Sequence, residues 1–394
     1  MRSLTGALAL LCVVGPLSTD MYLPAFPRMA GELGTDASGV QLTLTAFLVG
    51  MTVGHLVFGP LSDRYGRRGP LLAGAVVCAV ATALCAVAPS LGWLVAARFV
   101  AGFSGAAGVV IGRAVVADVA RGAAAARLLA LLMTLSTIAP IVGPLVGGAV
   151  IEALGWRGVF WVLGGVAAAV AAAVALFVPE SLPPERRVGG GVRELAASIR
   201  EVVGDRAYTG YTLAFSFGFG ALFCYISGSP FLLQNELGLS VRASSAAFSA
   251  GAVMAAAGGV VSARLVERVG PERLLRTGLL AVLSACAGLL GVTLVGGLTV
   301  VVCLPLVAVM CLGVGLALSN AAALAIGRVP GAAGVGSAVL GTVQSGVGAG
   351  VAPVVGDEVG RLFGVMGVCA AVAVVCAAFA HRASHPVVPA SSTP

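Results

Sequence analysis

The stretch most informative about the fold is Gly59-Pro60-Leu61-Ser62-Asp63-Arg64-Tyr65-Gly66-Arg67-Arg68, which lies between apolar stretches at about 38–60 and 70–88. Its two flanking glycines permit a tight turn and close packing. Asp63 lies at the edge of an apolar stretch, where a charge is costly without a partner, and Arg67 follows one helical turn later. An ordinary arginine-rich loop would explain the cations but not this order of residues. The segment predicts a short loop between two membrane-spanning helices.

The composition extends this prediction to the whole chain. Of its 394 residues, 59% are hydrophobic and 10% are charged, with a mean hydropathy of +1.05. Soluble domains are roughly 45–50% apolar and about 25% charged. A helix needs ~20 apolar residues to cross a bilayer. The sequence predicts an all-α polytopic membrane protein with twelve transmembrane helices at about 3–28, 38–60, 70–88, 92–117, 128–151, 157–178, 207–233, 243–263, 272–293, 296–321, 332–354 and 361–381.

The count of spans has alternatives of eleven and thirteen, because 272–321 is almost unbroken apolar sequence. This stretch is too long for one crossing, and Gly296-Gly297 is the expected turn between two.

Arginine sets the expected orientation, since the chain contains no lysine. With the amino terminus inside, 18 of the 23 arginines fall in inner loops or ends and 4 fall outside, while Arg98 lies within a span. The positive-inside rule favours this arrangement. We therefore expect a multi-pass protein of the bacterial inner membrane with both termini in the cytoplasm. The net charge of +7 then reflects topology and does not indicate nucleic-acid binding.

A polar stretch near the midpoint divides the spans six and six. It predicts an N-terminal six-helix bundle over 1–178, a cytoplasmic linker over 179–206 and a C-terminal bundle with a short tail over 207–394. Two short repeats support the division. The pattern L-x-[D/E]-R-x-G occurs at 61–66 and 265–270, and Gly143-Pro144-Leu145-Val146-Gly147 is echoed by Ala352-Pro353-Val354-Val355-Gly356. Duplicated six-helix halves are typical of transporters.

Catalytic and metal-binding patterns are missing from the sequence. The nine cysteines are scattered through apolar stretches without a CxxC pair, which is typical of small buried hydrophobic residues. There is also no HExxH motif and no phosphate-binding loop. We expect no enzymatic activity, no metal, no cofactor and no ATP-driven pumping.

The loop motif at 59–68 resembles that between helices two and three of the major facilitator superfamily. Trp156-Arg157-Gly158-Val159-Phe160 is similar to the W-R-x-x-F of the family, and Gly143-Pro144-x-x-Gly147-Gly148 resembles the antiporter motif of its drug exporters. The resemblance implies two six-helix halves. Four further segments resemble the bicyclomycin/chloramphenicol exporter branch: Ser18-Thr19-Asp20-Met21-Tyr22-Leu23-Pro24-Ala25, Gln41-Leu42-Thr43-Leu44-Thr45, Leu182-Pro183-Pro184-Glu185-Arg186-Arg187 and Tyr225-Ile226-Ser227-Gly228-Ser229-Pro230-Phe231.

Asp20 and Arg98 are the ionisable residues farthest from the expected membrane edges. Counting 1.5 Å per residue places Asp20 ~12 Å and Arg98 ~10 Å from the outer helix ends. A charge within a span indicates function by default. The resemblance implies that helices one and four both line the cavity and that the two charges can meet there. Leu94-x-x-x-Arg98-x-x-x-Gly102 also resembles a motif linked to proton coupling, although Ala101 stands where the family usually has glutamine.

These observations predict that the Asp20 carboxylate takes either a proton or an arrangement induced by the substrate. Protonation of Asp20 would loosen its tie to Arg98 and favour one orientation of the cavity. A static ion pair that joins helices one and four is the alternative.

A second charged group is expected at the inner side. Asp63, Arg64, Arg67 and Asp118 are predicted to form a charge network, because Asp118 resembles an acid that joins the loop motif in relatives. We interpret this network as a gate that closes the inner side in one state. The alternative is that Asp118 only offsets Arg113 and Arg121.

The fifth span combines Pro140 with Gly143, Pro144, Gly147 and Gly148. Prolines interrupt helical hydrogen bonds, and glycines four residues apart permit close helix contact. The pattern predicts a bent, closely packed helix that resists proton leak, with ordinary glycine-rich packing as the alternative.

Several residues are candidates for the lining of a drug cavity. Aromatic side chains at every fourth position of the seventh span would stack on flat, weakly polar compounds, or would instead face lipid. The polar candidates would contact substrate or only bond neighbouring helices. The candidates are Tyr22, Gln41, Phe215, Phe219, Phe223, Tyr225, Asn320 and Gln344.

The sequence therefore predicts a proton-coupled exporter of drugs that works by alternating access. Chloramphenicol-like and bicyclomycin-like antibiotics are the leading substrates, and an endogenous metabolite is the alternative cargo. The expected partners are small molecules, protons and the lipid bilayer, with no nucleic acid, and the chain should function as a monomer.

Overall fold

The computed structural model describes residues 2–119, 122–187 and 199–384. Within these ranges there is no strand, and eleven helices are long and apolar enough to cross a membrane. One of them, α6 (Gly122–Phe177), has 56 residues and a non-helical break at Gly155. It therefore supplies two crossings, at the predicted fifth and sixth spans. The all-α transmembrane fold is confirmed.

The remaining long helices follow the predicted spans closely, and most extend a few residues beyond them. In the first half they are α1 (Arg2–Asp20), α2 (Phe26–Leu33), α3 (Ala37–Tyr65), α4 (Arg68–Ala86) and α5 (Leu91–Val119). In the second half they are α8 (Arg206–Phe231), α9 (Val241–Val269), α10 (Pro271–Leu294), α11 (Val300–Gly327), α12 (Ala333–Val355) and α13 (Val359–Ser384).

The turn between α10 and α11 lies where the sequence placed it, with Gly296 at a φ of +70°. Helix starts are also encoded locally. The side chains of Asp36, Asp205 and Ser240 each accept a hydrogen bond from a backbone N–H three residues later, which satisfies a donor that the first turn leaves free.

The first predicted span is interrupted. Instead of one helix over 3–28, α1 ends at Asp20, a short 3-10 turn covers Leu23–Ala25, and α2 continues from Phe26. Pro24 explains the interruption, because it has no N–H to donate to the carbonyl of Asp20 four residues earlier. The break exposes the backbone around Asp20 and Met21 to contacts that a regular helix would prevent.

The reversal within α6 is anchored to α2. Glu32 accepts hydrogen bonds from Trp156 Nε1 at 2.7 Å and Arg157 Nη1 at 3.0 Å, and it pairs with Arg28 at 2.8 Å. Gly155 adopts a φ of +71°, which only glycine takes readily. The W-R-x-x-F pattern thus fixes the entrance of the sixth span against α2.

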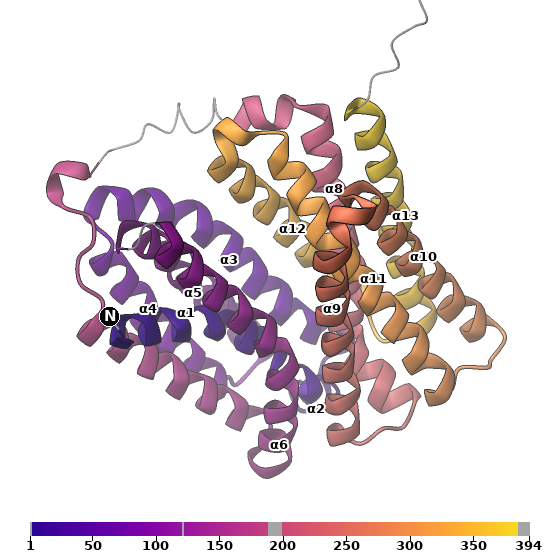
Figure 1. The fold of residues 1–394 in the computed structure, drawn as a ribbon. Coiled ribbons are helices and arrows are strands. Elements are labelled where there is room, and N and C mark those ends of the chain that lie inside the picture. The colour runs from indigo at the N-terminus through magenta and orange to yellow at the C-terminus, as the bar shows by residue number, and fades with distance from the viewer. Residues whose placement is uncertain (1, 120–121, 188–198, 385–394) are drawn as a thin grey trace, which may run out of the picture.

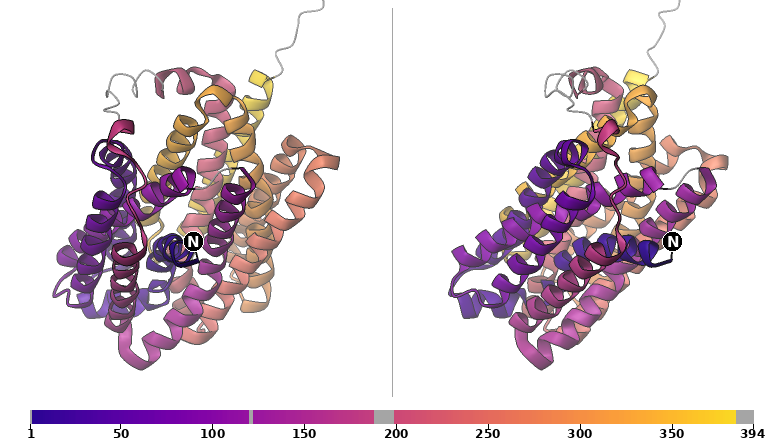
Figure 2. Two further views of the ribbon diagram at one scale, coloured as in Figure 1. Left: turned by 60° about the vertical axis from the view of Figure 1, so that its left-hand side comes forward. Right: turned by 90° about the vertical axis from the view of Figure 1, so that its left-hand side faces the viewer.

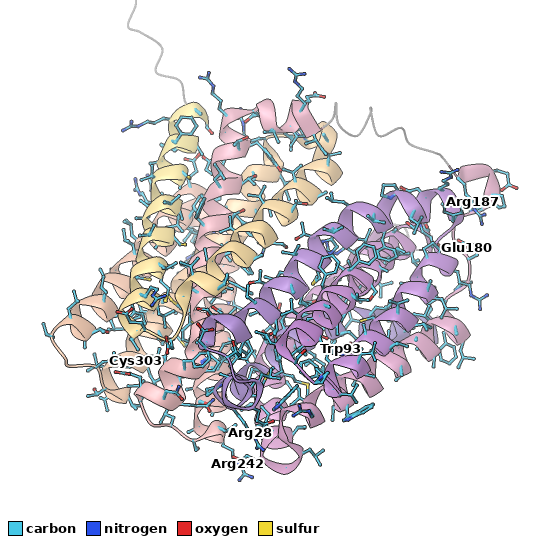
Figure 3. The ribbon with its side chains drawn as sticks, turned by 180° about the vertical axis from the view of Figure 1, so that it is seen from behind. Arg28, Trp93, Glu180, Arg187, Arg242 and Cys303 are labelled. Carbon is cyan, nitrogen blue, oxygen red and sulfur yellow. The ribbon has the colours of Figure 1, made fainter. Side chains whose placement is uncertain are left out.

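The helices form two bundles, which Figure 1 shows converging near α2 and diverging toward the linker. We call the end near the linker the linker end and the opposite end the distal end. Figure 3 shows Glu180 and Arg187 at the linker end and Arg28 and Arg242 at the distal end. In Figure 2 the reversal of α6 again lies away from the linker.

The buried apolar residues follow the same division. A cluster from Ala7 to Val178 belongs to the first half, and a cluster from Val202 to Ala380 belongs to the second. Both consist of residues near the linker end. The largest cluster contains residues of both halves, from Met21 to Ala370, and lies toward the distal end. Among the described residues, the halves therefore share a buried core only at the distal end.

Polar contacts between the halves have the same distribution. Among the described side chains, those that cross the interface join distal residues: Gln41 to Ser227 and Gly356, Thr45 to Ala349, Gln234 to Pro24, and Arg242 to Glu152. The protein is closed at its distal end in this conformation.

Candidate functional site

Asp20 is buried at the point where α1 breaks, with 6% of its surface exposed. Helix α6 packs directly on this break. A Cβ added to Gly143 would lie 3.5 Å from Cβ of Asp20, and one added to Gly147 would lie 1.9 Å from the carbonyl oxygen of Met21. No side chain fits at position 147, so glycine is required for this approach. The sequence predicted close packing here, and the structure supplies its partner.

The next glycine of the motif faces the other half of the protein. A Cβ at Gly148 would lie 2.5 Å from Oγ of Ser245 on α9. One turn of α6 therefore contacts the break beside Asp20 on one side and the second half on the other. A shift of the α1 break would be transmitted to the interface between the halves through this turn.

Arg98 is almost completely buried, with 1% of its surface exposed, and it is surrounded by aromatic rings. Its guanidinium carbon lies 4.2 Å from the ring centre of Phe47, 4.4 Å from that of Tyr22 and 5.8 Å from that of Phe160. Its Nε and Nη2 have no hydrogen-bond partner. Each ring contributes about 0.5–2 kcal/mol, whereas burying a cation costs several kcal/mol. The site thus keeps two donors of a buried cation free for an acceptor.

The pattern Leu94-x-x-x-Arg98-x-x-x-Gly102 has a direct structural explanation. A Cβ at Gly102 would lie 2.1 Å from the backbone oxygen of Phe47. Because Gly102 admits the backbone of α3 this closely, the Phe47 ring can lie over the guanidinium of Arg98 one turn away. Ala101 is buried in a small apolar cluster with Phe47 and Ala81.

The expected contact between Asp20 and Arg98 is not formed in this conformation. The ion pairs among the described residues do not include either of them. The reason is the break in α1, after which the Tyr22 ring covers the guanidinium, with Tyr22 Oη 3.2 Å from Oγ1 of Thr43. The alternative, a static ion pair between helices one and four, is also not present in this conformation.

At the linker end, the structure brings Asp63, Arg67 and Asp118 together. Arg67 Nη1 lies 2.5 Å from Oδ1 of Asp63, and Arg67 Nε lies 3.2 Å from Oδ2 of Asp118. Arg67 Nη1 also donates to Oγ of Ser62 at 2.7 Å. These bonds join α3 to α5 within the first half. The role of the group as a gate stays a prediction.

The prediction that Arg64 belongs to this network is wrong for this conformation. Arg64 is exposed, and its guanidinium carbon lies 5.3 Å from the ring centre of Tyr65. Asp118 is not simply an offset for neighbouring arginines, because its partners are Arg67 and Ser181. Arg121, also named in that alternative, and the linker centre over 188–198 lie outside the described residues.

Sequence reasoning missed the first residues of the linker. Glu180 accepts hydrogen bonds from the backbone N–H groups of Arg67 at 2.8 Å, Arg68 at 3.3 Å and Leu182 at 3.0 Å. Because α4 begins at Arg68, Glu180 caps it from another part of the chain. The sequence feature that could have indicated this role is the pair Glu180 and Ser181, just after the end of the sixth span. Gly66, with a φ of +91°, leaves the space that the Glu180 carboxylate occupies.

The charge of Glu180 is stabilised by these donors. Partial burial raises its pKa, but the N–H groups of Arg67, Leu182 and Arg68, together with Arg187, outweigh burial and hold the pKa below its ordinary value of 4.5. A lowered carboxyl pKa contributes stability that is complete above the ordinary value and is lost as the pH falls through the lowered one. The cap is therefore fully present at neutral pH.

We expect Glu180→Gln to loosen the start of α4. Losing a capping carboxylate costs about 1 kcal/mol, which corresponds to about fivefold faster hydrogen exchange of the amides at 67–71 at pH 7. Mass spectrometry of the purified protein measures this rate. Glu185→Gln, which changes an exposed acid of the same linker, is the matched control and should exchange like the wild type. Equal rates in all three proteins would contradict the capping role.

The aromatic candidates of α8 fall into two groups. Phe219 and Phe223 stack on each other, with ring centres 5.5 Å apart, and both lie near Gly348 of α12 and Leu48 of the first half. These two rings lie between the halves and do not face lipid. Phe215 is half-buried nearer the linker end.

The other candidates differ in whether their polar atoms already have hydrogen-bond partners within the protein. Tyr225 packs inside the second half against Phe248, with its hydroxyl unpartnered. Asn320 donates to Ser262 at 2.7 Å, so it bonds a neighbouring helix. Gln344 is half-buried on α12. Gln41 is fully engaged with the second half and has no free polar atom for a substrate in this conformation.

Comparison with known proteins gives a consistent result. The sequence profile of the Major Facilitator Superfamily matches residues 8–353. An uncharacterized MFS-type transporter, YdgK of Bacillus subtilis (strain 168), is 36% identical over 89% of this chain and 87% of its own. The bicyclomycin resistance protein homolog of Haemophilus influenzae is 30% identical over 93% of both chains. A chloramphenicol resistance protein of Pseudomonas aeruginosa is 34% identical over 71% of this chain and 66% of its own.

Solved structures agree on the fold. A bacterial homolog of the human lysosomal transporter Spinster superimposes with a TM-score of 0.76 at 17% identity, covering 97% of this chain and 96% of that chain. A D-xylose-proton symporter gives 0.75 at 16% identity, covering 96% and 97%. The family match, the relatives and the fold together show that this chain belongs to the Major Facilitator Superfamily.

Proposed function

We propose that this transporter is a proton-coupled exporter of drugs. The observation that carries the proposal is the buried Asp20 at the break of α1, without an ion-pair partner, against the α6 turn that also contacts the second half. An isolated carboxyl in such a place is costly and points to function. The arginine distribution favours a linker end in the cytoplasm and a distal end outside, in a bacterial inner membrane.

The proposed coupling uses two arrangements of the same residues. In the distally closed conformation, Arg98 lies among aromatic rings with Nε and Nη2 unpartnered, and Asp20 forms no ion pair with a described residue. When Asp20 ionises, its carboxylate needs donors, and Arg98 offers two. Pairing requires the Tyr22 ring to leave the guanidinium, which moves the α1 break. Because α6 packs on this break through Gly147 and on α9 through Gly148, the movement alters the contact between the halves.

The proposed substrates are flat, weakly charged compounds. Phe219 and Phe223 offer stacked rings between the halves, next to the apolar Leu48. Aromatic faces of this kind bind rings and exclude strongly anionic solutes, which would need arginines in the same place. The relatives named for bicyclomycin and chloramphenicol resistance support these two drug classes as leading candidates. One chain contains both halves, so we propose a functional monomer.

Expression in an efflux-deficient bacterial host tests the proposal. The chain should raise the inhibitory concentration of at least one compound among chloramphenicol, florfenicol, bicyclomycin and sulfonamides. Dissipating the proton gradient with an uncoupler should restore accumulation of that compound. If the chain is present in the membrane and no compound shows a shift, the drug proposal fails. Export of an endogenous metabolite is then favoured, and comparison of the culture media with and without the protein would identify it.

A further inference from the structure

Gln41, in the first turns of α3, is completely buried at the distal end. Its side-chain amide makes three hydrogen bonds to the backbone of the second half. Nε2 donates to the carbonyl oxygens of Ser227 at 3.2 Å and Gly356 at 3.0 Å. The N–H of Gly356 donates to Oε1 of Gln41 at 3.1 Å. One side chain of the first half therefore binds two helix ends of the second half.

The partner peptide group is unusual. Gly356 ends α12 with φ +63° and ψ −148°, a conformation that essentially only glycine adopts. A helix end leaves carbonyl groups without helical partners. Here both the N–H and the C=O of Gly356 face the Gln41 amide, which pairs with them through two matched hydrogen bonds. The strained glycine is thus shaped to receive an amide.

The internal repeat places a related contact between the halves at Ser245, but without hydrogen bonds to the backbone of the other half. Gln41 corresponds to Ser245, because 245 − 41 equals 204, the separation of the two L-x-[D/E]-R-x-G segments at 61 and 265. Gly356 corresponds to Gly147 in the second repeat. Ser245 packs next to Gly148, but its hydroxyl donates to Val241 of its own helix at 2.7 Å. The two contacts differ by one position, because Gly147, the counterpart of Gly356, packs on Met21 and its neighbour Gly148 meets Ser245. Of these two contacts, only that of Gln41 is hydrogen-bonded between the halves among the described residues.

We propose that Gln41 is the latch that holds the distal end closed. Closing forms its bonds to Ser227 and Gly356, and opening must break all of them together. In the open arrangement water can satisfy these polar groups. If Gln41 is replaced by a side chain that cannot form these hydrogen bonds, the backbone groups of Ser227 and Gly356 are buried and unpaired in the closed arrangement but not in the open one. The replacement therefore destabilises the closed arrangement alone. Gln41 thereby sets the balance between the two arrangements and does not act as a substrate contact.

Hydrogen exchange of the purified full chain in lipid nanodiscs tests this latch. In Gln41→Met, which keeps the length but loses the amide, exchange of the amides at 352–360 should accelerate at least about tenfold. Gln41→Asn, whose amide is one methylene too short, should accelerate the same amides. Thr45→Val removes one bond to Ala349 at the same interface and should have a smaller effect.

Asn320→Leu is the matched control. It removes buried amide hydrogen bonds to Ser262 and Leu316, both within the second half. It should leave exchange at 352–360 at the wild-type rate. The latch is overturned if Gln41→Met and Gln41→Asn exchange like the wild type, or if Asn320→Leu accelerates these amides equally. Should one Gln41 variant not fold, the other decides. The measurement needs neither a drug nor a proton gradient, so its outcome is independent of the proposed export.

Discussion

Asp20→Asn is expected to reach the membrane in wild-type amounts and to lose proton-driven export down to the background rate. The asparagine side chain is as large and as polar as that of aspartate but cannot bind or release a proton. A change of protonation therefore can no longer switch the α1 break between its two arrangements. Because Asp20 is buried and forms no ion pair in this conformation, replacing its carboxyl by the asparagine amide should not disturb the fold. Inverted membrane vesicles with an imposed pH gradient measure export of the drug identified by susceptibility.

Glu236→Gln is the matched control for this experiment. Glu236 is an exposed acid in the π-helical segment Leu232–Glu236, which follows α8 at the distal end, and its neutralisation should leave proton-driven export intact. Full export by Asp20→Asn would show that another group carries the proton. Equal loss in both variants would indicate that any loss of negative charge at this end impairs transport, and would also contradict the assignment.

Gly147→Ala should destabilise the protein and impair export. The added Cβ would lie 1.9 Å from the Met21 carbonyl oxygen, a backbone atom that cannot rotate away. Helix α6 and the α1 break must therefore move apart. Overpacking of this kind costs about 1–3 kcal/mol. Thermal unfolding of the purified protein should show a lower Tm, and vesicles should show slower export because the contact beside Asp20 is displaced.

Gly165→Ala, in the second crossing of α6 beyond the break at Gly155, is the control. A Cβ at Gly165 meets nothing within 4 Å, so only the intrinsic preference of a helix for alanine remains, a gain of about 0.5–1 kcal/mol. Its Tm should equal or slightly exceed that of the wild type. If Gly147→Ala unfolds at the same temperature as Gly165→Ala, the tight contact with Met21 does not contribute to stability.

The sequence was sufficient for features that depend on neighbouring residues. Apolar length and arginine placement are local, so the spans, the paired Asp63 and Arg67, and the turn at Gly296 could be read directly. The break at Asp20 was also encoded, by Pro24, but a search for apolar length overlooks a missing N–H. Glu180 was missed because its role depends on the start of α4, more than a hundred residues earlier in the chain.

The loop at 59–68 and the apolar spans by themselves determined a helical membrane protein with two related halves, because the bilayer admits few other solutions for such a chain. Only the tertiary structure decided which charges meet. It separated Asp20 from Arg98, surrounded Arg98 with rings from α3, α6 and the break after α1, and directed Gln41 to Gly356, 315 residues away. Such contacts depend on how the two halves are arranged, and the same sequence allows more than one arrangement.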